Sequence, residues 1–272
     1  MKKWLHSAAG IASIILITIA LLLLVIVLFT VGANDPCFCS NVLIGVATNL
    51  LGIVVTISFV QYFLDKQNRE IGRKEEIKII KRYDKYMETL INRYFKFYMS
   101  LTTRLDNRKD FDIKQVYEHQ FKFSDLADMY RTSSYVGEGL MEPTITLFYK
   151  AEENLQNYIL KMLENIDFRY TQNLENILQK FLEKTAEFNV RGSILGALNT
   201  SFGGKKSFEE ISNWIADEKE LWLEKFEKGE LRVYNVMYPY VILYFGIQKQ
   251  VQILKEYRDY VSTLFTDERT EG

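Results

Sequence analysis

The side chains that most often carry catalysis or bind metals are scarce in this chain. It contains two histidines, His6 and His119, and two cysteines, Cys37 and Cys39. These four residues do not combine into one of the ligand sets that hold a zinc ion. The sequence also lacks the Gly-x-Ser-x-Gly motif that presents a nucleophilic serine. We therefore predict that the protein is not an enzyme and has no cofactor, no metal site and no small-molecule substrate.

Two other patterns resemble reactive groups but have simpler explanations. Segment 203–207 reads Gly-Gly-Lys-Lys-Ser, yet a phosphate-binding loop has Ser or Thr directly after its Gly-Lys pair, where this chain has Lys206. We interpret the segment as a turn with two solvated lysines. The adjacent carboxylates of Glu152 and Glu153 are interpreted as charges on the surface of a helix.

The distribution of charged residues divides the sequence into two parts. No Lys or Arg occurs between Lys3 and Lys66, and only two acids lie in that interval, whereas the rest of the chain is densely charged. We therefore predict a lipid-facing part, residues 1–65, and a water-facing part, residues 66–272. The formal net charge of −1 gives no general reason to expect binding to nucleic acid.

Two apolar segments, about 8–31 and 42–64, are each long enough to cross a membrane. The first corresponds to roughly 36 Å of helix, against about 30 Å for the hydrocarbon core. Gly, Asn, Asp and Pro in the intervening segment 32–41 are typical of a turn. These features predict an N-terminal hairpin of two transmembrane helices.

A secretory signal peptide is the alternative explanation for the first segment. Lys2 and Lys3 would form its basic start, and Val31-Gly32-Ala33 resembles a cleavage site. The apolar run is longer than the ~7–15 residues usual for a signal peptide. We therefore favour a segment that is retained as an anchor.

The distribution of basic residues predicts the orientation of the hairpin. Lys2 and Lys3 precede the first helix, the loop has neither Lys nor Arg, and a basic cluster follows the second helix. The cluster includes Arg69, Arg73, Lys74 and Lys78. By the positive-inside rule both termini lie in the cytoplasm, and loop 32–41 lies in the periplasm if the membrane is a bacterial inner membrane. The basic cluster either contacts anionic lipid headgroups or is simply solvated.

The two cysteines of the loop are then predicted to face an oxidising compartment. Cys37 and Cys39 are separated by one residue, so a bridge between them would be strained. A disulfide between two copies of the chain and two free thiols both remain open.

The second apolar segment has an asymmetric face. Gly45, Asn49, Gly52 and Thr56 follow one another at steps of four, three and four, which places them on one side of a helix. Small residues allow close approach of helices in lipid, and Asn and Thr can hydrogen-bond across the contact. This stripe either packs against the first helix or mediates self-association, with a polar path through the bilayer as a further consequence.

Beyond the membrane segments the apolar pattern predicts a long membrane-proximal helix that ends near Leu105. A seam with steps of three and four residues runs through it, which is the spacing of a packed helix face. The seam residues are Ile80, Tyr83, Met87, Leu90, Tyr94, Phe97 and Leu101. We expect this helix to join the hairpin to the cytoplasmic domain.

The remaining sequence predicts further helices and few strands. Asp112 is a plausible N-cap for a short helix that ends near Phe121, and Pro143 and Pro239 are placed to open two longer helices. Ser207 begins a capping-box pattern, so we expect it to open a helix that continues through Trp222 and Phe226. The predicted fold class is all-α: a two-helix transmembrane hairpin followed by a cytoplasmic helical bundle.

The hairpin also carries a resemblance to a known class of proteins. The basic start, the sequence Asn-Leu-Leu-Gly-Ile-Val-Val-Thr from Asn49 to Thr56, and the exit Phe63-Leu64-Asp65-Lys66 resemble the two-transmembrane effectors of bacterial antiphage systems, retrons in particular. In these systems a reverse transcriptase and its RNA–DNA product restrain the effector, and phage interference releases it to damage the inner membrane. The resemblance implies no catalytic residues.

From this resemblance we expect a membrane toxin whose release causes abortive infection. Its expected partners are the lipid bilayer, further copies of the chain and, in a retron, the reverse transcriptase with its RNA–DNA product. The alternative is a non-toxic, membrane-tethered sensor or scaffold that recruits a cytoplasmic partner. Tyr and Phe side chains that are left outside the core would be suited to such a partner.

Overall fold

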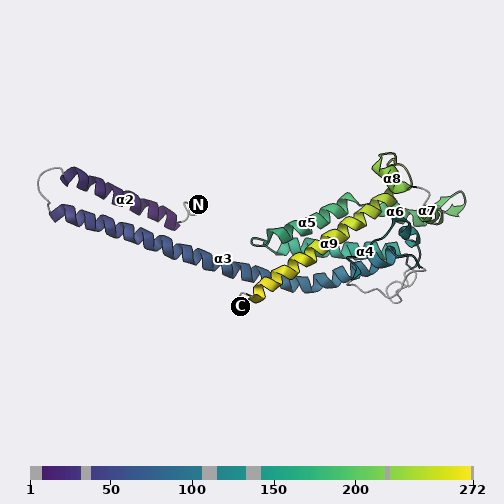
Figure 1. Ribbon diagram of the computed structural model, residues 1–272, viewed down its shortest axis with the longest axis horizontal. Helices are drawn as coiled ribbons and strands as arrows, with labels where there is room; N and C mark the ends of the chain where they lie inside the picture. The colour runs from purple at the N-terminus through teal and green to yellow at the C-terminus, as the bar shows by residue number, and fades with distance from the viewer. Residues whose placement is uncertain (1–7, 32–37, 106–114, 133–141, 218–220, 271–272) are drawn as a thin grey trace. The chain divides into compact units, whose positions relative to one another are not determined.

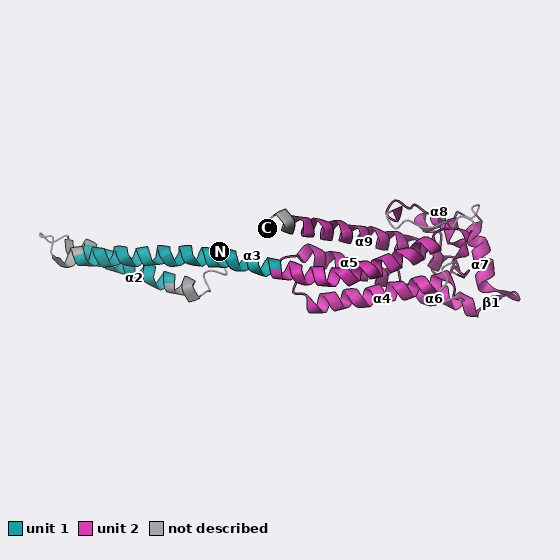
Figure 2. Ribbon diagram, turned by 90° about the horizontal axis from the view of Figure 1, so that it is seen from below, with its two compact units in different colours: residues 1–74 teal, residues 75–272 magenta. Residues whose placement is uncertain are grey.

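The computed structural model describes residues 8–31, 38–105, 115–132, 142–217 and 221–270 (Figure 1). Nearly all elements in these ranges are helices, and the strands found there are two pieces of two residues each. The predicted all-α fold class is therefore confirmed. Contacts divide the chain into two units, residues 1–74 and 75–272, and the boundary falls inside one continuous helix (Figure 2).

The first unit contains α2, Ala8–Val31, and the beginning of α3, Phe38–Leu101. α2 has no charged residue, and α3 has none before Asp65. The two stretches lie side by side in both views (Figures 1 and 2). α2 covers the same residues as the first predicted apolar segment, whereas α3 begins at Phe38 rather than near residue 42. Residues 32–37 of the predicted loop lie outside the described ranges.

A narrow seam of small and medium side chains joins α2 to α3. Ser13, Ala20 and Val27 of α2 are buried, and so are Ala47 and Val54 of α3. Within each helix these residues are seven apart, a spacing that returns to nearly the same side of a helix. α2 and α3 therefore contact each other along one face of each helix.

Much of the remaining surface of these two stretches is apolar and exposed. Phe29 on α2 and Val55 and Phe59 on α3 are examples of large side chains without cover in the single chain. Among the described residues α3, from Val42 onward, is the helix long and apolar enough to cross a membrane. The apolar stretch of α2 whose side chains are described, Ser13–Val27, is shorter. An uncovered apolar surface of this kind requires lipid or protein around it.

The second unit is a helical bundle. The later part of α3 runs alongside α4 (Thr144–Asn165), α5 (Gln172–Glu187) and α9 (Tyr238–Thr270) (Figures 1 and 2). Large aromatic side chains fill the space between these helices. Six of the fully buried ones are Tyr94, Tyr98, Phe148, Phe181, Tyr240 and Tyr257. Their rings meet at tilted and edge-to-face angles, the arrangements that aromatic pairs prefer.

Short elements close the end of the bundle where α6, α7, α8 and β1 are labelled in Figure 2. They are η3 (Phe123–Asp128), α6 (Arg191–Gly196), η4 (Ala197–Asn199), β1 (Ser201–Phe202), β2 (Lys205–Lys206), α7 (Ser207–Ala216) and α8 (Trp222–Glu227). β1 and β2 pair antiparallel around Gly203 and Gly204, whose φ angles are +53° and +86°. Positive φ at both central residues is the geometry of a tight hairpin turn and favours glycine.

Three local predictions were wrong. Residues 115–121 form turns instead of the end of a helix that was expected to begin at Asp112, a residue outside the described ranges. Ser207 is not the N-cap of α7, because it is the first residue of the helix and Lys206 holds the N-cap position; its Oγ atom accepts a hydrogen bond of 2.9 Å from Thr200 Oγ1. The helix expected to continue through Trp222 ends at Ala216, and α8 is separate.

Candidate functional site

The polar stripe lies on the side of α3 that faces away from α2. Asn49, Gly52 and Thr56 are exposed and Gly45 is half-buried, whereas the buried residues in this part of α3 include Ala47 and Val54. At about 100° per residue, Ala47 and Val54 point roughly 180° away from the centre of the stripe. Contact with α2 therefore leaves the stripe uncovered.

The surroundings of the stripe are open. A Cβ atom placed on Gly45 or Gly52 would meet no other atom within 4 Å. The hydroxyl of Thr56 donates a hydrogen bond of 2.9 Å to the carbonyl oxygen of Gly52, so it is satisfied within α3. The described residues offer no hydrogen-bond partner to the side-chain amide of Asn49. Asn49 is thus the group in the stripe with free hydrogen-bonding capacity.

The basic cluster and the seam occupy different environments on α3. Arg69, Arg73, Lys74 and Lys78 are all exposed. Of the seam residues, Tyr83 is half-buried, and the others are buried: Ile80, Met87, Leu90, Tyr94, Phe97 and Leu101. Ile77, Ile91, Phe95 and Tyr98 are buried as well. The buried face is therefore wider than a two-position heptad seam, because α3 is covered by several helices and not by one.

A polar network crosses the middle of the bundle. The hydroxyl of Tyr94 on α3 donates a hydrogen bond of 2.6 Å to Gln250 Oε1 on α9. Gln250 Nε2 in turn donates to Glu152 Oε1 on α4, at 2.5 Å, and to Thr185 Oγ1 on α5, at 3.4 Å. Side chains from four helices thus meet at one amide. A polar network in a low-dielectric core favours one register of the helices, since a shift would leave its members unpaired.

Glu152 is the ionisable member of this network and is only 8% exposed. Burial raises the pKa of its carboxyl group to about 7, and the hydrogen bond from Gln250 and the charge of Arg191 oppose this rise only in part. The Arg191 side chain pairs with Glu153 at 2.7 Å. Near neutral pH the Glu152 carboxyl group is therefore balanced between its two protonation states.

The interpretation of Glu152 as a surface charge was wrong, although the sequence held a signal for its burial. Glu153 is exposed, but Glu152 is buried. Phe148, Glu152, Leu155 and Ile159 follow one another at steps of four, three and four, so Glu152 occupies an apolar position of the helix pattern. An acid at a core position is the pattern that marks a buried carboxylate.

A second buried carboxylate, Glu76, ties α3 to the start of α5. Glu76 is buried and accepts hydrogen bonds from the backbone nitrogen of Tyr170, at 3.0 Å, and from Thr171 Oγ1, at 2.5 Å. Thr171 is the N-cap residue of α5. A carboxylate at a helix N-terminus is stabilised by the unpaired N–H groups and by the helix dipole. Glu76 therefore ties α3 to Tyr170 and Thr171, the two residues that lead into α5.

His119 and segment 203–207 contact neighbours within the bundle, whereas His6 and Cys37 lie outside the described residues. His119 lies beside Thr102, with 3.0 Å between Nε2 and Oγ1, and burial lowers the pKa of its imidazole. Lys205 in the hairpin pairs with Glu210 at 2.9 Å. Lys206 lies over the ring of Phe208, 5.7 Å from its centroid. Segment 203–207 is thus a turn whose lysines contact neighbours in the chain.

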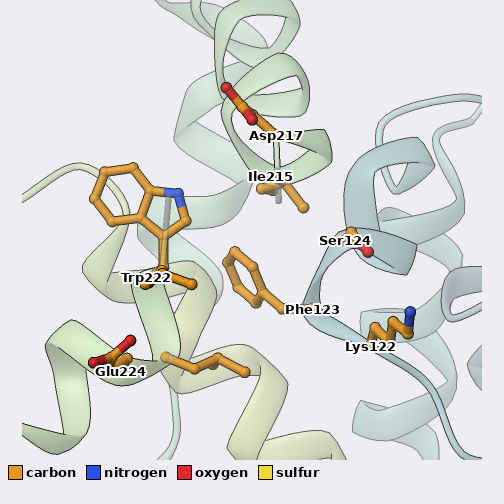
Figure 3. Close-up of a pocket in the computed structure, with 9 residues that line it drawn as sticks. Lys122, Phe123, Ser124, Ile215, Asp217, Trp222 and Glu224 are labelled. Atoms are coloured by element: carbon orange, nitrogen blue, oxygen red, sulfur yellow. The ribbon is translucent and has the colours of Figure 1, made fainter. Parts of the chain in front are cut away.

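One hollow at the closed end of the bundle lies between η3, α7 and α8 (Figure 3). It has a volume of about 330 Å³ and lies against Phe123, Ile215 and Trp222. Lys122, Asp217 and Glu224 also line it, so charges of both signs surround the apolar floor (Figure 3). In the described part of the chain no group of three or more His, Cys, Asp or Glu side chains is arranged to hold a metal ion.

Comparison of the chain with models of protein families, with curated proteins and with solved structures found no match. The features of the chain that bear on its function are therefore the apolar helix, its stripe and the bundle.

Proposed function

We propose that this protein is a membrane-embedded effector of an antiphage defence system, which disrupts the inner membrane when it is released from inhibition and so causes abortive infection. In this proposal α2 and residues 42–64 of α3 cross the bacterial inner membrane as a hairpin. Both termini lie in the cytoplasm, and loop 32–41 lies in the periplasm.

The observation that carries the proposal is the position of the stripe on α3. Because α2 covers the side with Ala47 and Val54, the exposed Asn49, Gly52 and Thr56 remain available to another copy of the chain. An Asn side chain that faces lipid alone is costly, and pairing with a polar group of a second helix removes that cost. Several hairpins that associate through this side would enclose polar groups within the bilayer.

The bundle is proposed to restrain this association. α3 carries both the stripe and the buried seam, so the helix that would rearrange in the membrane is also held by the bundle core. Glu76, through Tyr170 and Thr171, is one of the contacts that hold it. In a retron the reverse transcriptase with its RNA–DNA product would bind the bundle and maintain the restraint, and phage interference would lift it.

The test is expression of the full chain in a bacterium, followed by membrane depolarisation and uptake of a normally excluded dye. We expect rapid depolarisation by the wild type, and a loss of at least about tenfold for Asn49→Leu or Gly52→Ile, since each removes a contact that the association requires. Val55→Leu is the matched control, because Val55 is exposed on the same helix about a quarter turn from the stripe.

The outcomes separate the two classes of function. Dye uptake that needs the hairpin and is lost in the stripe variants supports the effector. A harmless protein that retains a soluble partner at the membrane supports the alternative, a tethered scaffold. Dye uptake that is unchanged in both stripe variants contradicts the role assigned to the stripe.

A further inference from the structure

The closed end of the bundle carries a second hollow with an unusual rim. Four large apolar side chains around it are exposed: Phe202 at 56%, Val233 at 75%, Tyr234 at 91% and Val236 at 36%. Phe202 belongs to β1, and the other three precede α9 (Figure 2 shows β1 at this end). We call these four residues the Tyr234 surface. Clusters of exposed apolar side chains on a folded domain mark contact surfaces.

The hollow beside the Tyr234 surface has a volume of about 370 Å³ and uncharged walls. Its other walls include Gly192, Gly196, Ile211 and Pro239, and no described residue that lines it is charged. Phosphate groups, nucleic-acid backbones and metal ions require charged or strongly polar ligands. The uncharged lining, which is polar in part, therefore matches an uncharged and largely apolar occupant.

The exposed rim distinguishes a macromolecule from a small apolar ligand. Tyr234 and Val233 line the hollow at its rim and keep 91% and 75% of their surface exposed, so a small molecule inside the hollow would leave most of both side chains in water. Only a surface laid over the hollow covers both. Protein interfaces are built in this way, with aromatic anchors that fill pockets on the partner.

The Tyr234 surface fits a second copy of itself. It holds a projecting aromatic ring and, beside it, a hollow large enough to receive one, which are the two halves of a two-fold symmetric contact. Its uncharged lining creates no repulsion when the same surface meets itself. Two nearby cations are paired within the chain, Lys205 with Glu210 and Arg191 with Glu153.

The walls of the hollow are already held in place. The hydroxyls of Tyr240 and Tyr130 hydrogen-bond over 2.6 Å, and Tyr130 donates 2.8 Å to the carbonyl oxygen of Ile194. Asn235 Oδ1 accepts from the backbone nitrogen of Met237 at 2.9 Å, which fixes the turn that presents Tyr234. A preorganised surface loses less conformational entropy on binding.

We propose that the Tyr234 surface docks onto the same surface of a second copy of this chain, with Tyr234 of each copy in the hollow of the other. Four exposed anchors are few beside the ~20–30 residues per side of a standard interface, so the contact alone is weak. It rests on the proposed function in one respect, since membrane attachment of the chains is what raises their local concentration.

The experiment places a photo-crosslinking benzoylphenylalanine at position 234 of the full chain, expressed in bacterial membranes. Copies labelled with heavy and light nitrogen are mixed, so that crosslinks between copies are distinguished by mass. We expect a crosslinked dimer whose adducts map to residues 192–202 or 233–240 of the second copy. The same probe at position 202 should give the same partner, and a probe at Tyr86, an exposed tyrosine elsewhere on the bundle, should give background yield.

A charged substitution in the Tyr234 surface makes the test quantitative. Val233→Asp should lower the dimer yield from the probe at position 234 by at least about tenfold, as expected for a disrupted interface anchor. Adducts with another protein, with nucleic acid or with lipid, or no adduct at either position, would overturn the proposal. The yield of crosslinked dimer does not depend on toxicity. A dimer without dye uptake would therefore contradict the effector function and still support this inference.

Discussion

Gln250 Nε2 donates a hydrogen bond of 2.5 Å to Oε1 of Glu152, and both side chains are buried between helices of the same bundle. The neutral amide is the strongest hydrogen-bond donor that the described residues provide for this carboxylate. An amide compensates a buried negative charge less well than a cation would. The bundle core therefore contains an acid that the folded state prefers to keep protonated.

The stability of the bundle should consequently depend on pH around neutrality. Burial raises the folded-state pKa of Glu152 from the ordinary value of 4.5 to about 7. The contribution of Glu152 to the free energy of unfolding is then complete below pH 4.5, and it is lost as the pH rises through about 7. The full loss is as much as about 3 kcal/mol. Denaturation of the full chain in detergent should show about 2 kcal/mol of this loss between pH 5.5 and pH 8.

Glu152→Gln should remove that pH dependence and stabilise the bundle at pH 8. The new amide is uncharged, and its carbonyl oxygen can still accept the hydrogen bond from Gln250. Glu164→Gln is the control, because Glu164 is an exposed acid on the same helix. If Glu152→Gln is no more stable than wild type at pH 8, the buried carboxylate does not carry the penalty described here.

Glu76 should contribute to stability through its contacts with the start of α5. Glu76→Ala leaves Tyr170 N–H and the Thr171 hydroxyl without their acceptor, so we expect a loss of about 1–3 kcal/mol in the free energy of unfolding. Thr171→Val removes one of the two contacts from the other side. In a double-mutant cycle the two changes should be strongly non-additive, and full additivity would show that the contact contributes nothing.

Helix α9 approaches the end of α5 more closely at Gly246 than any side chain would allow. A Cβ atom on Gly246 would lie 2.8 Å from Cβ of Phe188. We expect Gly246→Ala to destabilise the bundle by about 1–3 kcal/mol, despite the better helix propensity of Ala. Gly192→Ala, where the added Cβ meets nothing within 4 Å, should be neutral or stabilising. Thermal unfolding of both variants provides the comparison.

The long elements were predictable because local patterns determine them. The seam from Ile80 to Leu101 repeats at helical spacing, and α4 and α9 begin next to Pro143 and Pro239, which restrict the chain to conformations at helix starts. The closed end of the bundle was less predictable. Its short helices and the hairpin around Gly203 depend on contacts with distant parts of the chain, which a local pattern does not contain.

The sites were predictable only as sets of candidate residues. The sequence placed Gly45, Asn49, Gly52 and Thr56 on one side of a helix, but it left open whether α2 covers that side. Small residues occur on both sides of α3, and Ala47 is as suitable for close contact as Gly45. The choice of Ala47 is visible only when α2 is in place. The Tyr234 surface was missed because its residues come from segments about 30 residues apart.

The orientation of the hairpin can be tested with the two native cysteines. If loop 32–41 is periplasmic, Cys37 and Cys39 should react with a membrane-impermeant maleimide in intact cells, either directly or after an impermeant reductant has opened a disulfide. The control is Lys161→Cys in a Cys37→Ser, Cys39→Ser background, since Lys161 is an exposed residue of the bundle and should react only after cell lysis. Replacing Arg69, Arg73, Lys74 and Lys78 together by Gln should weaken the preference for this orientation, because the prediction of a cytoplasmic end for the second proposed span rests on these cations. Labelling of position 161 in intact cells, in the Cys37→Ser, Cys39→Ser chain that keeps its basic cluster, would contradict the predicted topology.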